Sequence, residues 1–411
     1  MKKNMIKLAA GAATVLLMAT SAHAGYTMKK KVGDIDTKLT FFGFAQLEAV
    51  GGNGMKLKYA KDGSGVKVGT NSGSDINFRA QRIRLGWKYV AGKVRGKVFL
   101  DFNQDHTSPG ATNGAAVPKM IKDAFIAYKF NNAFIPKLGV IKMPNGMGFT
   151  MPGWNLDIAE RGFDKSLVLE RNMGLMISGR DIGLGDHGKV NGFEMGHERP
   201  WKGFGYDVMI ANQANRSKAV QNTSGMGGNS YAARGMFDYT EKLHVEASYA
   251  LSQNAGGYVA TGATSADNQD YSNVNLGVDS NLGELSLKAE YTTAHNITGI
   301  KDYDEDTYTA TAAYFVMPNL ELVAKTIQGS AQKGTSAITT KLGNTYLGFN
   351  LFLSQPHSDF SRKSKRARNQ QKIVFNYILA SGSGATEGAG KWTGLSGYRD
   401  DAFIAQYQFK F

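Results

Sequence analysis

Apolar and polar residues alternate along most of the chain, in segments of about nine to twelve residues. An alternation with a period of two is typical of β-strands, because successive side chains point to opposite faces of a sheet. The last segment has one aromatic face and one mostly polar face. The first face holds Phe403, Ala405, Tyr407, Phe409 and Phe411, and the second holds Ile404, Gln406, Gln408 and Lys410. No helical period stands out after the first 24 residues, so the pattern predicts an all-β protein.

Following the alternation, we predict about sixteen strands. Their expected ranges are 37–50, 77–89, 93–103, 121–130, 134–142, 173–180, 203–212, 230–239, 243–252, 271–280, 284–293, 306–316, 320–328, 343–354, 371–380 and 400–411. Short turns alternate with longer loops rich in Gly, Asn, Ser and Asp, which is the rhythm of an up-and-down barrel. Two connections, 181–202 and 355–370, are long where this rhythm requires a short turn.

The composition decides which kind of all-β protein this is. Beyond the N-terminus no stretch of about 18 apolar residues exists, so a helical membrane protein is excluded. Fifty glycines and 22 phenylalanines against eight prolines suit many short strands, and the absence of cysteine excludes a disulfide framework. We predict a transmembrane antiparallel β-barrel of about sixteen strands with short periplasmic turns and long outer loops. The alternative is a soluble β-sandwich whose last strand is 400–411.

The N-terminus has the pattern of a secretory signal peptide. Lys2, Lys3 and Lys7 precede an apolar run from Leu8 to Ala19, and Ala22 and Ala24 form an A-x-A cleavage site. We therefore expect residues 1–24 to be removed and residues 25–411 to form the barrel. Export combined with a membrane barrel predicts the outer membrane of a Gram-negative cell.

Positive charge is in excess, with 48 Lys and Arg against 34 Asp and Glu. Such an excess fits nucleic acid, acidic lipid or a pore that attracts anions. Export argues against nucleic acid. A closed barrel of about sixteen strands is wide enough to hold an aqueous channel, which makes an anion-attracting pore the preferred interpretation.

Basic residues follow one face of two neighbouring strands. In 77–89 and 93–103 the opposite face is apolar, with Ile83, Leu85, Trp87 and Tyr89 as its clearest members. An arginine facing lipid costs about 2–4 kcal/mol at the bilayer midplane, so the basic face must line the lumen. The predicted basic ladder consists of Arg82, Arg84, Lys88, Arg95 and Lys97. The alternative is that these residues pair with lumen acids such as Asp101 and Asp123 and only brace the wall.

The connection 143–171 is the longest predicted outer loop, and it is unusually apolar. Its apolar residues are Phe149, Trp154, Leu156, Ile158, Phe163 and Leu167. We expect the loop to fold into the barrel and narrow the pore, where Lys142, Arg161, Lys165 and Arg171 would join the ladder. Asp157, Glu160 and Asp164 would hold it in place through ion pairs. The alternative is a loop that covers a contact between subunits.

Around this loop the chain resembles the phosphate-selective porins of the O and P type. The resemblance rests on LGVIKMPNGMGF (138–149), AERGF (159–163), ERNMGLMISGR (170–180) and the strand pair 82–102. It implies a trimeric, anion-preferring channel of sixteen strands with a folded-in third loop, and Lys142, Arg161 and Arg171 match motif positions. The chain departs from the family pattern at Asn145–Gly146, in place of an aromatic–glycine pair, and at Gly162, in place of serine. The aromatic last strand ending in Phe411 resembles the assembly signal of outer-membrane barrels.

Enzymatic chemistry finds little support. The histidines are scattered without metal-ligand spacing, and His106 beside Asp105 is the only pair that suggests a barrel hydrolase. No C-x-x-C-H motif exists for covalent haem, although a barrel could still enclose an electron-transfer cytochrome. The acidic stretch Asp302–Tyr308 is a weak candidate for a divalent cation. We expect no cofactor and no catalytic or metal site.

The sequence thus favours a passive channel for small hydrophilic solutes that prefers anions, phosphate or other oxyanions. Its expected partners are small anions, outer-membrane lipid and lipopolysaccharide, two further copies in a homotrimer, and the barrel-assembly machinery through Phe411. One basic run, 362–368, falls on the periplasmic side by the strand count. It is either a solvated turn or, if the count is off by one strand, a surface for lipopolysaccharide phosphates.

Overall fold

The structure, a computed structural model, describes residues 26–52, 76–103, 120–183, 203–213, 228–239, 242–254, 269–333, 340–353, 370–382, 397–398 and 401–411. In these residues it places four short helices, α2 (Met147–Thr150), η1 (Gly153–Asn155), η2 (Phe163–Leu167) and η4 (Ile297–Gly299). The strands are β1 (Thr27–Val32), β2 (Ile35–Gly52), β3 (Asn77–Ala91), β4 (Val94–Asp101), β5 (Ile121–Tyr128), β6 (Ile135–Lys142), β7 (Arg171–Ile182), β8 (Gly203–Asn212), β9 (Asn229–Tyr239), β10 (Leu243–Ser252), β11 (Tyr271–Leu282), β12 (Leu285–His295), β13 (Tyr303–Met317), β14 (Leu320–Lys333), β15 (Thr340–Phe352), β16 (Gln371–Ser381) and β17 (Ala402–Lys410).

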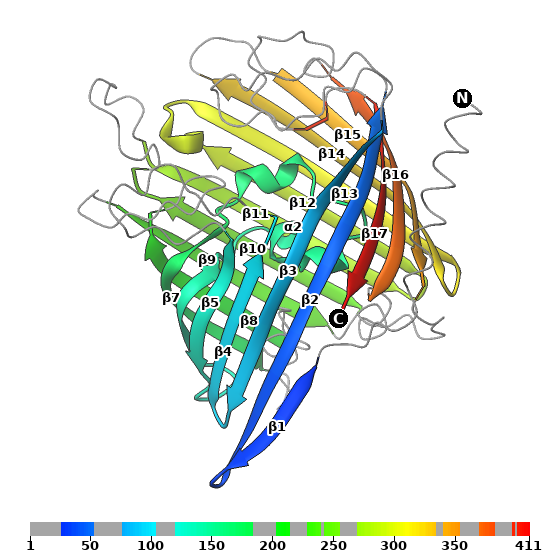
Figure 1. The fold of residues 1–411 in the computed structure, drawn as a ribbon. Coiled ribbons are helices and arrows are strands. Elements are labelled where there is room, and N and C mark those ends of the chain that lie inside the picture. Colours follow the sequence, from blue (N-terminus) through cyan, green and yellow to red (C-terminus); the bar gives the residue numbers. More distant parts are fainter. Residues whose placement is uncertain are drawn as a thin grey trace.

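Strands β2 to β17 form one closed antiparallel barrel (Figure 1). Each pairs with the next along the chain, and β17 pairs with β2 so that Ala402 lies opposite Gly52 and Lys410 opposite Phe44. Closure leaves no unpaired sheet edge in the hydrocarbon, where unsatisfied backbone groups are costly. The predicted barrel of sixteen strands is confirmed within the described residues, and each predicted strand is present.

Several strands are longer at their outer ends than predicted. The strand expected at 306–316 begins at Tyr303, and the one expected at 320–328 continues to Lys333. In these extensions backbone pairing continues while polar residues occupy both faces, so the sequence loses the alternation that marks a strand.

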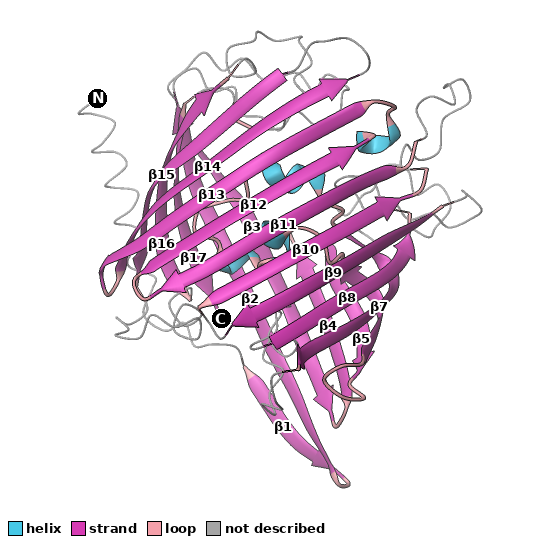
Figure 2. Cartoon of the chain, turned by 180° about the vertical axis from the view of Figure 1, so that it is seen from behind, coloured by secondary structure: helices cyan, strands magenta, loops and turns pink. Residues whose placement is uncertain are grey.

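The strand β1 was not predicted from the sequence. This strand pairs with the first residues of β2, from Thr27 opposite Thr40 to Val32 opposite Ile35, and the hairpin turns at Gly33 with a φ of 59°. The hairpin projects beyond the end of the barrel (Figures 1 and 2). Three consecutive lysines in β1 interrupt the apolar–polar alternation, which is why no strand was predicted there.

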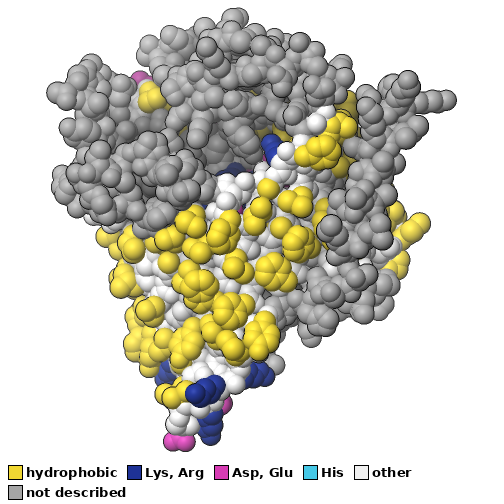
Figure 3. Space-filling view, in the orientation of Figure 1, with side chains coloured by type: hydrophobic (Ala, Val, Ile, Leu, Met, Phe, Trp, Pro, Cys, Tyr) yellow, Lys and Arg dark blue, Asp and Glu magenta, His cyan; other side chains and the backbone are white. Residues whose placement is uncertain are grey.

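The predicted inner and outer faces are confirmed on β3 and β4. Ile83, Leu85 and Trp87 are exposed on the outer face, whereas Arg82 is only 7% exposed on the inner face. Apolar side chains cover the outer wall in the space-filling view, and basic side chains gather at its lower tip (Figure 3). This is the distribution required of a wall that faces lipid.

No helix among the described residues is long and apolar enough to cross a membrane.

Several predictions concern segments outside the described residues. These are the signal peptide 1–24, His106, the basic run 362–368, and nearly all of the two long connections 181–202 and 355–370.

Candidate functional site

The third outer loop, residues 143–170 and called L3 below, folds into the barrel between β6 and β7 (Figures 1 and 2). It contains α2, η1 and η2, and η2 packs against β12, β13 and β14. Its six predicted apolar anchors, Phe149, Trp154, Leu156, Ile158, Phe163 and Leu167, are all buried. The prediction of an inward-folded loop is therefore confirmed. The alternative of a loop that covers a subunit contact does not fit, because these anchors pack inside the lumen.

The start of L3 is bonded to the wall formed by β10, β11 and β12. Three consecutive backbone N–H groups donate to wall side chains: Gly146 to Ser248 (3.2 Å), Met147 to Asn275 (3.1 Å) and Gly148 to Glu290 (2.9 Å). The first N–H groups of a helix have no intrahelical acceptor, so these side chains satisfy donors that would otherwise be buried without a partner.

The middle of L3 is bonded to the opposite wall, where side chains of β15, β16, β17 and β2 approach its backbone. The donors to L3 carbonyl oxygens are Gln46 to Gly153 (3.1 Å), Gln408 to Trp154 (3.1 Å), Lys372 to Leu156 (2.6 Å), Asn350 to Asp157 (2.9 Å) and Gln406 to Ala159 (2.7 Å). The polar face of the last strand does not face open water in the lumen, because Gln406 and Gln408 are buried under L3.

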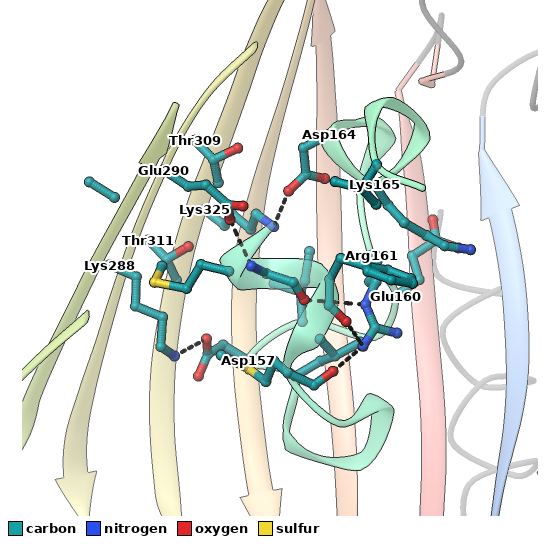
Figure 4. A pocket seen from close by; sticks show the side chains of 18 residues that line it. Asp157, Glu160, Arg161, Asp164, Lys165, Lys288, Glu290, Thr309, Thr311 and Lys325 are labelled. Atoms are coloured by element: carbon teal, nitrogen blue, oxygen red, sulfur yellow. Dashed lines mark hydrogen bonds and ion pairs between the residues drawn. The ribbon is translucent and has the colours of Figure 1, made fainter. Parts of the chain in front are cut away.

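The three predicted acids of L3 form ion pairs with the barrel wall. Asp157 pairs with Lys288, Asp164 pairs with Lys325 at 3.4 Å, and Glu160 pairs with Arg79 at 3.2 Å. Figure 4 shows the first two pairs between L3 and the wall. The prediction that these acids hold the loop in place is confirmed.

The basic ladder is present on the inner wall, but two of its members are neutralised locally. Arg84 Nε donates to Asp101 at 2.8 Å, and Lys97 pairs with Asp123. Arg82 donates to the side-chain oxygen of Gln46, a neutral partner. The bracing alternative therefore describes Arg84 and Lys97, and Arg82 keeps a charge with no described carboxylate within ion-pair distance.

Lys88 and Arg95, the remaining ladder residues, lie nearer the periplasmic end. The Lys88 ammonium lies over the Phe42 ring, 4.8 Å from its centroid. The Arg95 guanidinium bends back and donates to the carbonyl oxygens of Gly92 and Val94 in the β3–β4 turn. The structure thus separates Arg95 from the other predicted pore residues.

Lys142, Arg161 and Arg171 surround the ring of Phe149, at 4.9, 5.7 and 5.9 Å from its centroid. Lys142 Nζ donates to the carbonyl oxygens of Phe149 (2.9 Å) and Thr150 (3.2 Å). Arg161 donates to three carbonyls of the same turn, including Phe149 at 3.2 Å. These two cations therefore fix the shape of L3, whereas Arg171 pairs with Asp123 at 3.1 Å.

One pore-side base was not predicted. Lys122 lies among Glu170, Arg171 and Arg84, although strand parity next to the inward Asp123 would place it in lipid. The β4–β5 pairing shifts register between Phe99 and Leu100, and this β-bulge turns Lys122 inward. A charged residue adjacent to an inward-facing residue in a membrane strand was the only signal in the sequence.

The cluster of cations perturbs the loop groups within it. Burial, followed by repulsion from Arg82, Arg84 and Arg171, lowers the pKa of Arg161 well below its usual value. Burial alone would raise the pKa of Glu170, but Lys165, Lys122 and Arg171 lower it well below its usual range. The bases on this side of L3 therefore act together on the two loop groups.

The described residues contain no group of three or more metal-ligating side chains in suitable geometry. The acidic stretch Asp302–Tyr308, a weak candidate for a cation site, instead begins β13 and pairs with β14.

Comparisons with known proteins agree with this architecture. The family model for phosphate-selective porin O and P matches residues 51–335. The outer-membrane channel DcaP of Acinetobacter baumannii is 15% identical over 95% of this chain and 100% of its own, with a TM-score of 0.54. The anion-selective porin from Comamonas acidovorans is 13% identical over 91% and 100%, with a TM-score of 0.56. OmpF of Salmonella typhi, solved with daunomycin, is 12% identical over 93% and 100%, with a TM-score of 0.57. No curated protein sequence matches the chain.

At these identities the solved structures establish the fold, and the family match establishes the relationship. The matched residues include β3 to β13 and all of L3, which are the elements that build the constricted lumen. Family and fold point to a channel rather than an enzyme. The chain belongs to the phosphate-selective porin O and P family and is a β-barrel porin of the Gram-negative outer membrane.

Proposed function

We propose that this porin passes small hydrophilic solutes by passive diffusion and prefers anions, phosphate or other oxyanions among them. The observation that carries the proposal is the cluster of bases near Phe149, where L3 faces β3 to β7. Its basic side chains are Arg82, Arg84, Lys97, Lys122, Lys142, Arg161 and Arg171, and the acids among them are Asp101, Asp123 and Glu170. These acids neutralise fewer than half of the bases. The acids elsewhere along L3 pair with Lys288, Lys325 and Arg79.

The arrangement of the pairs explains how a positive field can persist. Asp123 is shared by Lys97 and Arg171, so this group of three keeps one positive charge. Arg82 and Lys122 add two more with no described ion pair. Fixed charges on a low-dielectric wall attract the oppositely charged solute and replace part of its hydration shell. Surrounding water keeps binding weak enough for the anion to leave.

Two comparisons support the preference for anions. The family is described as phosphate-selective, and one solved structure of the same fold is an anion-selective porin. We further propose a homotrimer, since OmpT of Vibrio cholerae, which shares the fold with a TM-score of 0.52, is recorded in a trimer form. We also propose that residues 1–24 are a cleaved signal peptide and that the outer loops contact lipopolysaccharide. Phe411, whose backbone bonds to Gly43 at 2.9 and 3.0 Å, would present the assembly signal.

The double variant Arg82→Gln and Lys122→Gln tests the charge argument. It removes two positive charges without leaving a described ion-pair partner alone, so the barrel should fold normally. A charge about 4 Å from a passing ion contributes about 1 kcal/mol in water, so the ratio of anion to cation permeability should fall about fivefold or more. The ratio is obtained from the reversal potential of the purified porin in a planar bilayer with a KCl gradient.

Arg95→Gln is the matched control, because its guanidinium is bonded to turn carbonyls of the same strand pair. Its permeability ratio should equal that of the unmodified porin. Cation preference in the unmodified porin would disprove the proposal, and an unchanged ratio in the double variant would show that these charges do not set it. Adding phosphate then separates oxyanion binding, which reduces the chloride current, from a general preference for anions.

A further inference from the structure

A cavity lies between L3 and the wall formed by β12, β13 and β14 (Figure 4). Its volume is about 40 Å³, enough for the centres of about three water molecules. Three water molecules fill about 90 Å³ of liquid, which is the size of a solute with five or six non-hydrogen atoms. The charged residues of its lining are balanced in sign, with Arg161, Lys165, Lys288 and Lys325 against Asp157, Glu160, Asp164 and Glu290.

Most of these charges are already used within the protein. Asp157 pairs with Lys288, and Arg161 donates to backbone carbonyls of L3. Both oxygens of Glu290 accept hydrogen bonds, one from the Gly148 N–H at 2.9 Å and one from Asn275 Nδ2 at 2.6 Å. Each of these groups thus already takes part in a bond of L3 or of the wall.

Lys325 and Asp164 differ from the others. Among the described residues, the one hydrogen bond and ion pair that either side chain forms is with the other, at 3.4 Å, although an ammonium group has three hydrogens to donate. Asp164 Oδ1 is buried and has no hydrogen-bond partner among the described residues. The Lys325 and Asp164 side chains as a whole remain 13% and 10% exposed. The hydroxyl groups of Thr309 and Thr311 line the same cavity.

We propose that this cavity is a binding subsite for small zwitterions of the α-amino acid class. The carboxylate of the solute would accept from Lys325 and the Thr311 hydroxyl, and its ammonium would donate to Asp164. Both contacts are charge-assisted and therefore stronger than bonds between neutral groups. Asp164 and Glu290 would repel a simple anion, and Lys325 would repel a simple cation. Neither ion can therefore make both contacts. The inference goes beyond anion preference, which concerns the basic wall formed by β3 to β7.

The Lys325–Asp164 pair also helps to hold L3, and this structural role alone would explain its presence. The two explanations differ in what they predict for added solute. A purely structural pair responds to no solute, whereas a subsite discriminates between a zwitterion and its separate halves. Glycine, acetate and methylamine provide that comparison, since acetate carries only the carboxylate and methylamine only the ammonium.

The test measures single-channel currents of the full mature porin in planar bilayers, with each solute added to one side. Glycine should cause brief blockades and bind at least about tenfold more tightly than acetate or methylamine, because it makes one more charge-assisted bond. Lys325→Gln and Asp164→Asn should each weaken glycine binding about tenfold, and Lys325→Arg should keep it. Lys38→Gln, at an exposed lysine of the β1–β2 hairpin, is the control for removing one positive charge.

Lys325→Gln and Asp164→Asn break the ion pair, and this alone could weaken glycine binding by displacing L3. Thr311→Val is therefore a third variant. It keeps the pair and the volume but removes a hydroxyl, so it should weaken glycine binding while the conductance without solute stays unchanged. The proposal is overturned if acetate blocks the channel as strongly as glycine does, or if glycine causes no blockade. It is also overturned if Lys325→Gln, Asp164→Asn and Thr311→Val all bind glycine normally. The reversal potential of the same channels reports anion preference separately, so failure of one proposal is distinguishable from failure of the other.

Discussion

At the scale of single residues, pairing decides which lumen charges act on a solute. Arg84 and Lys97 were predicted as pore ligands from strand parity, and parity placed both on the correct face. Their partners Asp101 and Asp123 come from neighbouring strands and neutralise them locally. A charge that is neutralised at contact distance contributes little field to the pore, so the ladder is effectively shorter than its sequence pattern indicates.

Arg84→Gln should destabilise the barrel more than it changes selectivity. It leaves Asp101, which is 1% exposed, as a buried charge without its ion-pair partner. The cost of such a change is about 3–5 kcal/mol. The temperature at which the barrel unfolds in detergent should therefore fall. This temperature is measured from the change in electrophoretic mobility when the barrel unfolds.

The double variant Arg84→Gln and Asp101→Asn is the control, because it removes the pair together. It should recover much of the lost stability and keep the reversal potential, since the net charge of the lumen is unchanged. If the single variant unfolds at the same temperature as the unmodified porin, the pair does not stabilise the wall.

At the scale of elements, L3 is bonded along its length to both walls, and one glycine permits its close approach. A Cβ at Gly162 would lie 1.8 Å from Ile327 Cδ1, so the side chain of Ile327 occupies the space that a serine would need. This gives a physical reason for one departure from the family motif: here the loop packs against a β14 isoleucine instead of carrying a side chain.

Gly162→Ser should displace L3 from β14 because the clash is with a fully buried side chain. The expected result is a noisier channel with altered conductance, measured as single-channel current fluctuations. Adding Ile327→Ala makes room for the serine and should restore a quiet channel. A quiet Gly162→Ser channel with unmodified conductance would show that L3 is not held by this contact.

Most of the strands could be predicted from the sequence, but two features of the sheet could not. Alternation located every strand of the barrel, because lipid outside and water or loop inside impose opposite requirements on successive residues. The strand β1 has no such constraint, since it lies beyond the barrel. The bulge that turns Lys122 inward was not visible either, because it arises from the register between two strands.

At the scale of the whole molecule, closure of β17 on β2 makes one rigid wall whose two faces have different solvents. The bases of β3 to β7 and of L3 then act together across the lumen rather than as single sites. Such a summed field weakens with salt, because the screening length falls from about 10 Å at 0.1 M to about 3 Å at 1 M.

The proposed anion preference should therefore decrease as ionic strength rises. Reversal potentials measured at a constant KCl ratio, with both sides raised from about 0.1 M to about 1 M, should give a falling permeability ratio. A ratio that does not depend on salt would indicate selection by direct contact at the narrowest point instead of by the field. The glycine blockade should survive high salt better, because its contacts are short and partly buried.

The barrel, its strand order, the facing of its walls and the inward loop could all be predicted from the sequence. These follow from local rules, since each residue of a membrane strand must suit lipid or the lumen, and an apolar loop must find something to pack against. Which charges remain unpaired depends instead on how the strands and L3 pack together. The partners of Arg84, Arg161 and Lys325 lie on other strands or elsewhere in L3, and their spacing depends on register, on a bulge and on how L3 packs. An ion pair requires two residues that are distant in the sequence to lie within a few ångströms of each other. The periodicity of the sequence carries no information on that distance.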